Sequence, residues 1–214
     1  MPRILPFEEH REEYEQWFVL NRFAYQSELD AVRQLLPEGK GLEIGVGSGL
    51  FAAPLGIEFG VEPSPKMLEL AKQRGIKVIR GIGEQLPVRN ASLDFALMVT
   101  TVCFLDNVMQ GFREAQRILK PGGHFLVGFI DRETPLGQEY QRFKNQSVFY
   151  RDAEFYSVQE LLDYLSRAGF GHFAFRQTIF HFLSEITTPE TVKSGWGEGS
   201  FVVIDAVKKK ERES

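Results

Sequence analysis

The sequence predicts an α/β fold of three layers, in which a doubly wound, mostly parallel sheet is covered by helices on both faces. Three observations predict it: short apolar runs alternate with helical patterns, a glycine-rich turn directly follows the first run, and a later run is apolar almost throughout. Alternating strands and helices are typical of parallel sheets, whose buried strands are apolar along their length. In such sheets ligands bind beyond the carboxyl ends of the strands, where the strand order reverses.

The chain begins with a long segment of helical spacing, whose aromatic residues recur on one face and which a proline–glycine break ends. We expect residues 1–36 to form a helical lid over the open end of the sheet and residues 37–214 to form a single structural unit. Within the lid, Tyr14, Arg22 and Tyr25 are candidates for closing the site, and Arg22 could meet a ligand carboxylate. Plain packing of an amphipathic helix is the alternative interpretation.

Seven apolar runs are predicted to be strands, over residues 41–45, 57–61, 77–79, 93–100, 124–130, 173–180 and 201–207. Helical patterns between them predict helices over residues 66–74, 108–119 and 158–168. Ser64 can cap the first of these, with Pro65 at its first position. Ser157 caps the last, and Glu160 completes a capping box. These start signals have a physical cause, because the first amides of a helix lack partners within it.

Composition narrows the class of protein. The formal net charge is -4 and the isoelectric point about 5.7, so nucleic-acid binding has no electrostatic support. One cysteine cannot form an internal disulfide, and no uninterrupted apolar run is long enough to span a membrane, so we expect a cytoplasmic protein. The histidines lack metal-ligand spacing, so we expect no metal. The 19 phenylalanines indicate an aromatic core, or a pocket that some of them line.

A glycine loop follows the first predicted strand. Gly45, Gly47 and Gly49 are spaced two and two, whereas a dinucleotide fingerprint has offsets of two and three. Glu43 precedes them, and an anion there would oppose a pyrophosphate but would suit the ammonium end of an amino-acid ligand. Glu62 follows at the end of the second strand, where a carboxylate can accept both hydroxyls of a ribose.

Five sequence blocks in this order resemble the class I S-adenosylmethionine-dependent methyltransferases, in particular the small-molecule branch related to quinone biosynthesis. The blocks are Leu42-Glu43-Ile44-Gly45-Val46-Gly47-Ser48-Gly49, Gly60-Val61-Glu62-Pro63-Ser64-Pro65-Lys66-Met67-Leu68, Gly83-Glu84-Gln85-Leu86-Pro87, Ser92-Leu93-Asp94-Phe95-Ala96 and Glu114-Ala115-Gln116-Arg117-Ile118-Leu119-Lys120-Pro121-Gly122-Gly123. The resemblance implies a Rossmann-like sheet of seven strands, the last one antiparallel, and S-adenosylmethionine as the cofactor.

The resemblance also implies a set of cofactor-binding residues: Glu43, Gly45, Gly47, Gly49, Glu62, Pro63, Met67, Gly83, Glu84 and Thr100. The glycines would pass under the methionine and ribose, and Glu62 would bind the ribose hydroxyls. Gly83 and Glu84 would border the adenine through backbone groups, while the Thr100 carbonyl would meet the amino group. Met67 could cover the adenine or belong to the core. Ile82 departs from the family, since many relatives have an acidic residue there that contacts the adenine amine.

The acceptor side is less defined. Because a sulfonium methyl group is already activated, in-line approach of a nucleophile can suffice, and a general base is optional. Asp131 is the candidate base, with a solvated turn residue as the alternative, and Thr101 is a candidate substrate contact. A small-molecule acceptor is expected, with no nucleic acid as partner; the oligomeric state is left open. The rival hypotheses are a non-catalytic S-adenosylmethionine-binding regulatory protein, an NAD-dependent oxidoreductase and a nucleic-acid enzyme.

Overall fold

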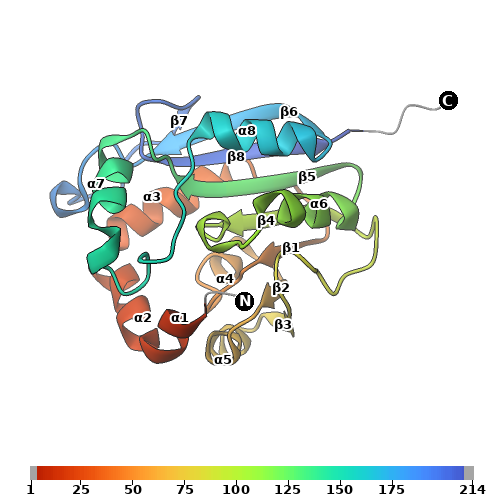
Figure 1. The fold of residues 1–214 in the computed structure, drawn as a ribbon, viewed down its shortest axis with the longest axis horizontal. Helices are drawn as coiled ribbons and strands as arrows, with labels where there is room; N and C mark the ends of the chain where they lie inside the picture. Colours follow the sequence, from red (N-terminus) through yellow and green to blue (C-terminus); the bar gives the residue numbers. More distant parts are fainter. Residues whose placement is uncertain (1–3, 210–214) are drawn as a thin grey trace.

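The computed structural model describes residues 4–209. Within them one sheet has the strand order β3-β2-β1-β4-β5-β8-β6-β7 (Figure 1). The strands are β1 (Gly41–Ile44), β2 (Phe59–Glu62), β3 (Lys77–Arg80), β4 (Leu93–Val99), β5 (Leu119–Ile130), β6 (Phe170–Thr178), β7 (Lys193–Ser194) and β8 (Phe201–Lys208). The strands β3, β2, β1, β4 and β5 pair in parallel, and β8 is antiparallel to both of its neighbours. The doubly wound fold with an antiparallel last strand is confirmed; the strand beyond the expected seven is the two-residue β7.

The strand order reverses between β1 and β4. From β1 the chain proceeds to β2 and β3 at one edge of the sheet, and it then returns to β4 on the other side of β1. The crossover helices that follow β1 and β4 therefore lie on opposite faces, and a crevice opens at the carboxyl ends of these two strands. This is the position that the sequence predicted for ligand binding.

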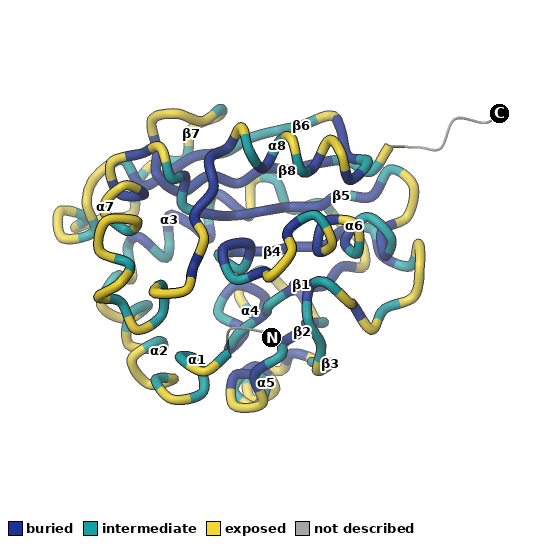
Figure 2. The backbone as a smooth tube through the Cα atoms, in the orientation of Figure 1, coloured by how far each residue is buried: buried dark blue, intermediate teal, exposed yellow. Residues whose placement is uncertain are grey.

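Helices cover both faces of the sheet (Figure 1). They are α1 (Leu5–Glu9), α2 (Arg11–Leu20), α3 (Arg22–Arg33), α4 (Ala52–Leu55), α5 (Pro65–Gln73), α6 (Val108–Ile118), α7 (Pro135–Phe143) and α8 (Val158–Arg167), with short 3-10 turns η1 (Val102–Phe104), η2 (Lys144–Gln146) and η3 (Leu183–Glu185). Alternate residues of β4 face opposite layers: Met98 packs in the cluster with α6 and α8, whereas Leu97 packs in the cluster with α3, α4 and α5. The sheet is consequently buried on both sides, as Figure 2 shows for its central strands.

The N-terminal segment differs from a single helix. It breaks at His10 and again at Asn21, where ψ is 34° and 36°, outside the helical range. The Asn21 side chain donates to the Trp17 carbonyl at 3.0 Å and so closes the end of α2. Neither α1 nor α2 has a fully buried residue, while α3 packs against β6 and β8 and contributes Leu29 and Val32 to the core. The third helix is therefore part of the helical layer on the sheet.

Helix starts agree well with the sequence. The Ser64 hydroxyl accepts from the Met67 amide at 3.2 Å, and Ser157 and Glu160 form the complete capping box. Several boundaries shift by up to five residues, and one helix was not predicted. Helix α6 ends at Ile118 and β5 begins at once, and α7 falls in a stretch where no element was predicted. The signal for α7 was present, because Thr134 caps it and a proline occupies its first position.

Among residues 4–209, no helix is both long enough and apolar enough to cross a membrane.

Candidate active site

A cavity of about 170 Å³ lies at the carboxyl ends of the central strands, against roughly 10–15 Å³ needed to hold one water molecule. Most of the residues singled out in the sequence line it: Tyr14, Gly45, Gly47, Glu62, Pro63, Met67, Gly83, Glu84, Thr100 and Thr101. Five others lie outside its lining: Arg22, Tyr25, Glu43, Gly49 and Asp131. The cavity is thus large enough for a ligand and is walled by both the strand ends and the N-terminal helices.

The glycine loop forms the floor of one end of the cavity. Gly45 and Gly47 have φ values of +70° and +54°, which a side chain disfavours. A Cβ on Gly45 would come within 2.3 Å of the Thr101 methyl group, and one on Gly47 within 3.3 Å of the Tyr14 hydroxyl. The Thr101 hydroxyl donates to the Gly45 carbonyl at 3.2 Å. The side chains of Thr101 and Tyr14 therefore pack closely on the loop, and glycine is the residue that fits at positions 45 and 47.

Gly49 completes the turn behind this floor. Its φ is +88°. A Cβ on Gly49 would lie 3.5 Å from the Cβ of Ala71 in α5. Gly49 thus shapes the loop by allowing α5 to pack closely, without lining the cavity itself.

Glu62 holds the loop from the end of β2. One carboxylate oxygen accepts from the Gly47 amide at 2.9 Å, and the other accepts from the Ser64 amide at 2.9 Å. Burial raises the pKa of Glu62 to about 7, although these two amides oppose the rise. Each carboxylate oxygen has a second lone pair, so Glu62 can still accept hydroxyl groups of a ligand from the cavity.

Glu43 lies behind the loop. It is 2% exposed, and its Oε2 has no hydrogen-bond partner within residues 4–209. Burial raises its pKa well above the ordinary range, and the nearby Glu62 carboxylate adds to the rise. A buried and unpartnered carboxylate oxygen at this loop is suited to a cationic ligand group or to a water bound by one.

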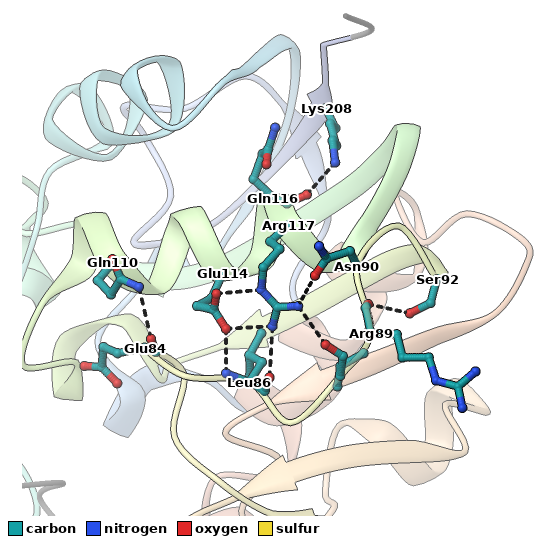
Figure 3. Close-up of polar contacts among 11 residues, drawn as sticks. Glu84, Leu86, Arg89, Asn90, Ser92, Gln110, Glu114, Gln116, Arg117 and Lys208 are labelled. Carbon is teal, nitrogen blue, oxygen red and sulfur yellow. Dashed lines mark hydrogen bonds and ion pairs between the residues drawn. The ribbon is translucent and has the colours of Figure 1, made fainter.

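The loop of residues 81–92 contributes residues 81–84 to the cavity lining, and helix α6 holds the loop in place (Figure 3). Arg117 donates to both oxygens of Glu114, at 2.7 and 2.8 Å, and also to the carbonyls of Leu86 and Val88. Gln110 donates to the Glu84 carbonyl at 3.3 Å. These bonds explain why the block that starts at Gly83 and the block that starts at Glu114 occur together in the sequence. The first block forms the loop, and the second block contains the end of the helix that holds the loop in place.

Backbone strain occurs at the end of β4. Thr100 has a φ of +49°, although it carries a side chain branched at Cβ, and it lines the cavity. Its amide donates to the Gly128 carbonyl at 2.7 Å, which holds the conformation in place. Strain of this kind costs on the order of 1–3 kcal/mol and is concentrated at functional sites.

Aromatic side chains form the other end of the cavity, and the sequence did not identify most of them as site residues. Phe7 packs edge-on against Phe104, with ring centroids 5.2 Å apart, and Phe104 stacks on Tyr150 at 6.1 Å. Tyr150 in turn stacks on Tyr140 of α7 at 5.3 Å. Phe149 continues the wall toward α1, with its ring centroid 5.6 Å from that of Phe7. We call these rings, together with Tyr14, Trp17 and Phe18, the aromatic wall; all of them line the cavity.

Glu28 is a charged residue of the cavity lining that the sequence did not identify. It projects from α3 into the cavity lining, is 5% exposed, and burial raises its pKa to about 8. The signal was available: Glu28 follows Tyr25 by three residues, which places a carboxylate on the apolar face of a helix.

Three sequence candidates are placed elsewhere. Arg22 is exposed, and its guanidinium lies 4.6 Å from the ring centroid of Phe23. The Tyr25 hydroxyl donates to the Leu50 carbonyl, and burial raises its pKa to about 12. Asp131 is buried below α7, where its carboxylate accepts from the Glu133 amide at 3.0 Å. Because Asp131 turns toward this backbone and lies outside the lining, the structure gives no support to it as a base.

Comparison with known proteins identifies the class. A family model described as a methyltransferase domain matches residues 42–127. An uncharacterized protein of Methanocaldococcus jannaschii is 44% identical over 202 residues, which is 94% of this chain and 98% of that protein. The demethylmenaquinone methyltransferase of Chlorobaculum tepidum is 30% identical over 118 residues, about half of each chain (50% and 49%).

A solved structure from Thermotoga maritima agrees over nearly the whole fold. That protein, described as an S-adenosylmethionine-dependent methyltransferase and possible histamine N-methyltransferase, is 53% identical, has a TM-score of 0.95, and covers 96% of this chain and 100% of its own. The chain therefore belongs to the class I S-adenosylmethionine-dependent methyltransferases, and its cofactor is S-adenosylmethionine. The hypothesis of an NAD-dependent oxidoreductase is excluded.

Proposed function

We propose that this enzyme transfers the methyl group of S-adenosylmethionine to a small molecule held against the aromatic wall, by direct in-line displacement. The observation that carries the proposal is the joint lining of one cavity: the glycine loop, Glu62 and the loop of residues 81–92 border one end, and the aromatic wall and Glu28 border the other. A cavity of this form can hold a donor and an acceptor in contact while excluding water.

The cofactor is assigned to the end with the glycine loop. Gly45 and Gly47 let it approach the backbone, and Glu62 binds the ribose hydroxyls with its remaining lone pairs. The unpartnered oxygen of Glu43, which lies behind the glycine loop, is assigned to the amino-acid portion through a water molecule. When bound, S-adenosylmethionine supplies a methyl group on a positively charged sulfur, which makes any residue that activates the donor unnecessary.

The adenine is assigned to the neighbouring edge of the same end. The backbone of Gly83 and Glu84 borders it, and Pro63, Met67 and the apolar Ile82 complete its pocket. Because Ile82 offers no acceptor for the adenine amino group, apolar contact contributes more of the binding here than in relatives with an acidic residue.

Helices α1 and α2 are proposed to be the lid. Glu8 of α1 accepts from the Ser64 hydroxyl and, at 3.1 Å, from the Lys66 amide at the start of α5. Glu15 of α2 pairs with Arg74 at the end of α5, and Arg74 also donates to the Ser48 carbonyl of the glycine loop at 2.9 Å. These contacts connect the lid to the cofactor end, so lid closure and cofactor binding are expected to be coupled.

A small acceptor is favoured over a macromolecule. The aromatic wall lines a cavity to which α1 and α2 themselves contribute side chains, and the net charge of -4 offers no attraction to a polyanion. The possible histamine N-methylation described for the Thermotoga maritima protein is also a reaction of a small molecule.

The proposal is tested with the donor first and the acceptor second. S-adenosylhomocysteine should raise the melting temperature, whereas NAD should not. Labelled S-adenosylmethionine is then offered with panels of amines, phenols, carboxylates and RNA, and label should move to a small molecule. Initial rates should follow ternary-complex kinetics, because direct transfer forms no methyl-enzyme. Ping-pong kinetics would contradict in-line transfer, and label on RNA alone would contradict the small acceptor.

A further inference from the structure

Among the buried carboxylates of residues 4–209, Glu28 has no hydrogen-bond or ion-pair partner at either oxygen, whereas Glu43 lacks one only at Oε2. Glu62 holds two backbone amides, and Asp205 lies 3.0 Å from the His124 ring nitrogen. No hydrogen bond or ion pair of the Glu28 carboxyl occurs within residues 4–209, yet the residue is 5% exposed. A carboxylate in such a position is unfavourable unless something compensates its charge. Because its side chain lines the cavity, a bound ligand can provide that compensation.

Three tyrosines lie within electrostatic reach of Glu28. Its charge acts on Tyr25 of its own helix, on Tyr140 of α7 and on Tyr150. Burial raises the pKa of each of these phenols above its usual value near 10, so all three stay neutral at physiological pH. Glu28 is thus the group in this set that titrates near neutrality, since burial raises its pKa to about 8.

Carboxylate and rings together point to one kind of ligand. Tyr140 and Tyr150 stack with ring centroids 5.3 Å apart and an interplanar angle of 26°, and the faces of such rings attract cations. A carboxylate beside aromatic faces is suited to an organic ammonium group, because the carboxylate balances its charge while the rings cover its carbon atoms. An anionic acceptor or a neutral alcohol would leave Glu28 protonated, so neither would gain the charge pairing that an ammonium group gains.

We propose that Glu28 binds the cationic nitrogen of the acceptor and receives its proton, so that the acceptor class is a small amine with an apolar body. The inference rests on the proposed function, since it places the amine in the acceptor end of the same cavity.

Proton transfer to Glu28 meets a chemical requirement of the reaction. A protonated amine has no free electron pair, so the ammonium group first gives one N–H proton to the Glu28 carboxylate. The freed pair forms the bond to the methyl carbon, and the carbon–sulfur bonding pair stays on sulfur. The products are the methylated ammonium and S-adenosylhomocysteine. When they leave, Glu28 keeps this proton and is back in the protonated form that it has in the free enzyme, so the one proton released per turnover is the proton that leaves Glu28 when the ammonium binds.

The test uses three probes with a common phenyl body: 2-phenylethylamine, 2-phenylethanol and 3-phenylpropionate. Their binding is measured by calorimetry with S-adenosylhomocysteine at saturation. The wild-type protein should bind the amine at least about tenfold more tightly than the alcohol or the acid. At pH 7, amine binding should release about one proton, detected as a dependence of the heat on the ionisation enthalpy of the buffer, because the ammonium drives Glu28 to ionise.

The variant Glu28→Gln keeps the shape of the side chain and removes its charge. It should lose both the tenfold preference and the proton release, while its affinity for S-adenosylhomocysteine stays within about twofold of wild type. Asp30→Asn on the same helix is the matched control: Asp30 pairs with Gln26 and Arg33 outside the cavity lining, and its loss should change neither readout.

Each outcome discriminates. Equal binding of amine and alcohol by the wild-type protein, or an amine preference that survives in Glu28→Gln, would overturn the inference about Glu28 while leaving cofactor binding intact. Failure of the wild-type protein to bind S-adenosylhomocysteine would instead refute the proposed function. If Glu28→Gln does not fold, the wild-type probe series and its proton release still decide the matter.

Discussion

The contact between Arg117 and the loop of residues 81–92 yields a prediction that can be worked out from the structure. Arg117 uses its guanidinium fully: two bonds reach Glu114, and the others reach the carbonyls of Leu86 and Val88 and the amide oxygen of Asn90, at 2.6–2.9 Å (Figure 3). Arg117→Met keeps most of the aliphatic length and removes every one of these bonds. The loop then keeps the bond from the Leu86 amide to Glu114 at 2.8 Å and the bonds of Glu84 to residues 106, 107 and 110.

The magnitude follows from the exposure of the two partners. A hydrogen bond to a charged group contributes about 1.5–3 kcal/mol when buried, and neutral ones contribute about 1 kcal/mol. Arg117 and Glu114 are 30% and 13% exposed, so water replaces part of what is lost. We expect Arg117→Met to lower the free energy of unfolding by about 2–3 kcal/mol in total. For a chain of this size that corresponds to a fall in melting temperature of roughly 4–12 °C.

The loop also carries Gly83 and Glu84, so its release should weaken S-adenosylhomocysteine binding about tenfold. Thermal unfolding and calorimetry measure the two effects separately. Arg113→Met is the matched control, because Arg113 is an exposed residue of the same helix and should tolerate the change. If Arg117→Met melts like Arg113→Met and binds the ligand like wild type, the proposed link between α6 and the adenine edge is refuted.

Three further predictions concern the glycine loop, the lid and the buried Glu28. Gly45→Ala should lower the free energy of unfolding by at least about 2 kcal/mol more than Gly56→Ala. The two glycines have similar φ values (70° and 72°), but only a Cβ on Gly45 would overlap a side chain, that of Thr101. Equal losses in denaturant unfolding would contradict the close packing of Thr101 on the glycine loop. Glu8→Gln should speed dissociation of S-adenosylhomocysteine several-fold in stopped-flow tryptophan fluorescence, because it weakens the lid's bonds to the start of α5; an unchanged rate would show that the lid is held otherwise. Burial raises the pKa of Glu28 from 4.5 to about 8, so its folded form keeps a proton that the unfolded chain has lost, and stability falls as pH rises between these values, by at most about 1.4 kcal/mol per pH unit. Denaturant unfolding of the ligand-free protein from pH 5 to 8 should show a shallower fall for Glu28→Gln, and parallel profiles would contradict this assignment.

Local signals predicted the helix boundaries where their causes are local. Ser64 with Pro65, and Ser157 with Glu160, satisfy the free amides at the start of a helix within a few residues, so the sequence contains the whole interaction. The breaks at His10 and Asn21 were not predicted, because apolar spacing continues across both of them. Docking of α3 on the sheet and of α1 and α2 over its end sets those breaks, and that is a tertiary effect.

The sequence by itself predicted the residues of the cavity end that we assign to the cofactor. Glycines at fixed offsets, Glu43 before them and Glu62 at the end of the next strand depend on the chain's local path and on pairing between adjacent parallel strands. The sequence also predicted the doubly wound sheet and the class of enzyme, whereas the order of the strands came from the structure.

Only the tertiary structure identified the residues of the cavity end that we assign to the acceptor. Glu28, Phe104, Tyr140 and Tyr150 come from distant parts of the chain, and nothing in their spacing indicates that they meet. Asp131, which follows a strand as a catalytic residue would, proved to turn toward the backbone below α7. The physical reason is that a strand end specifies an edge of the sheet, whereas the direction of each side chain depends on which helices pack over that edge.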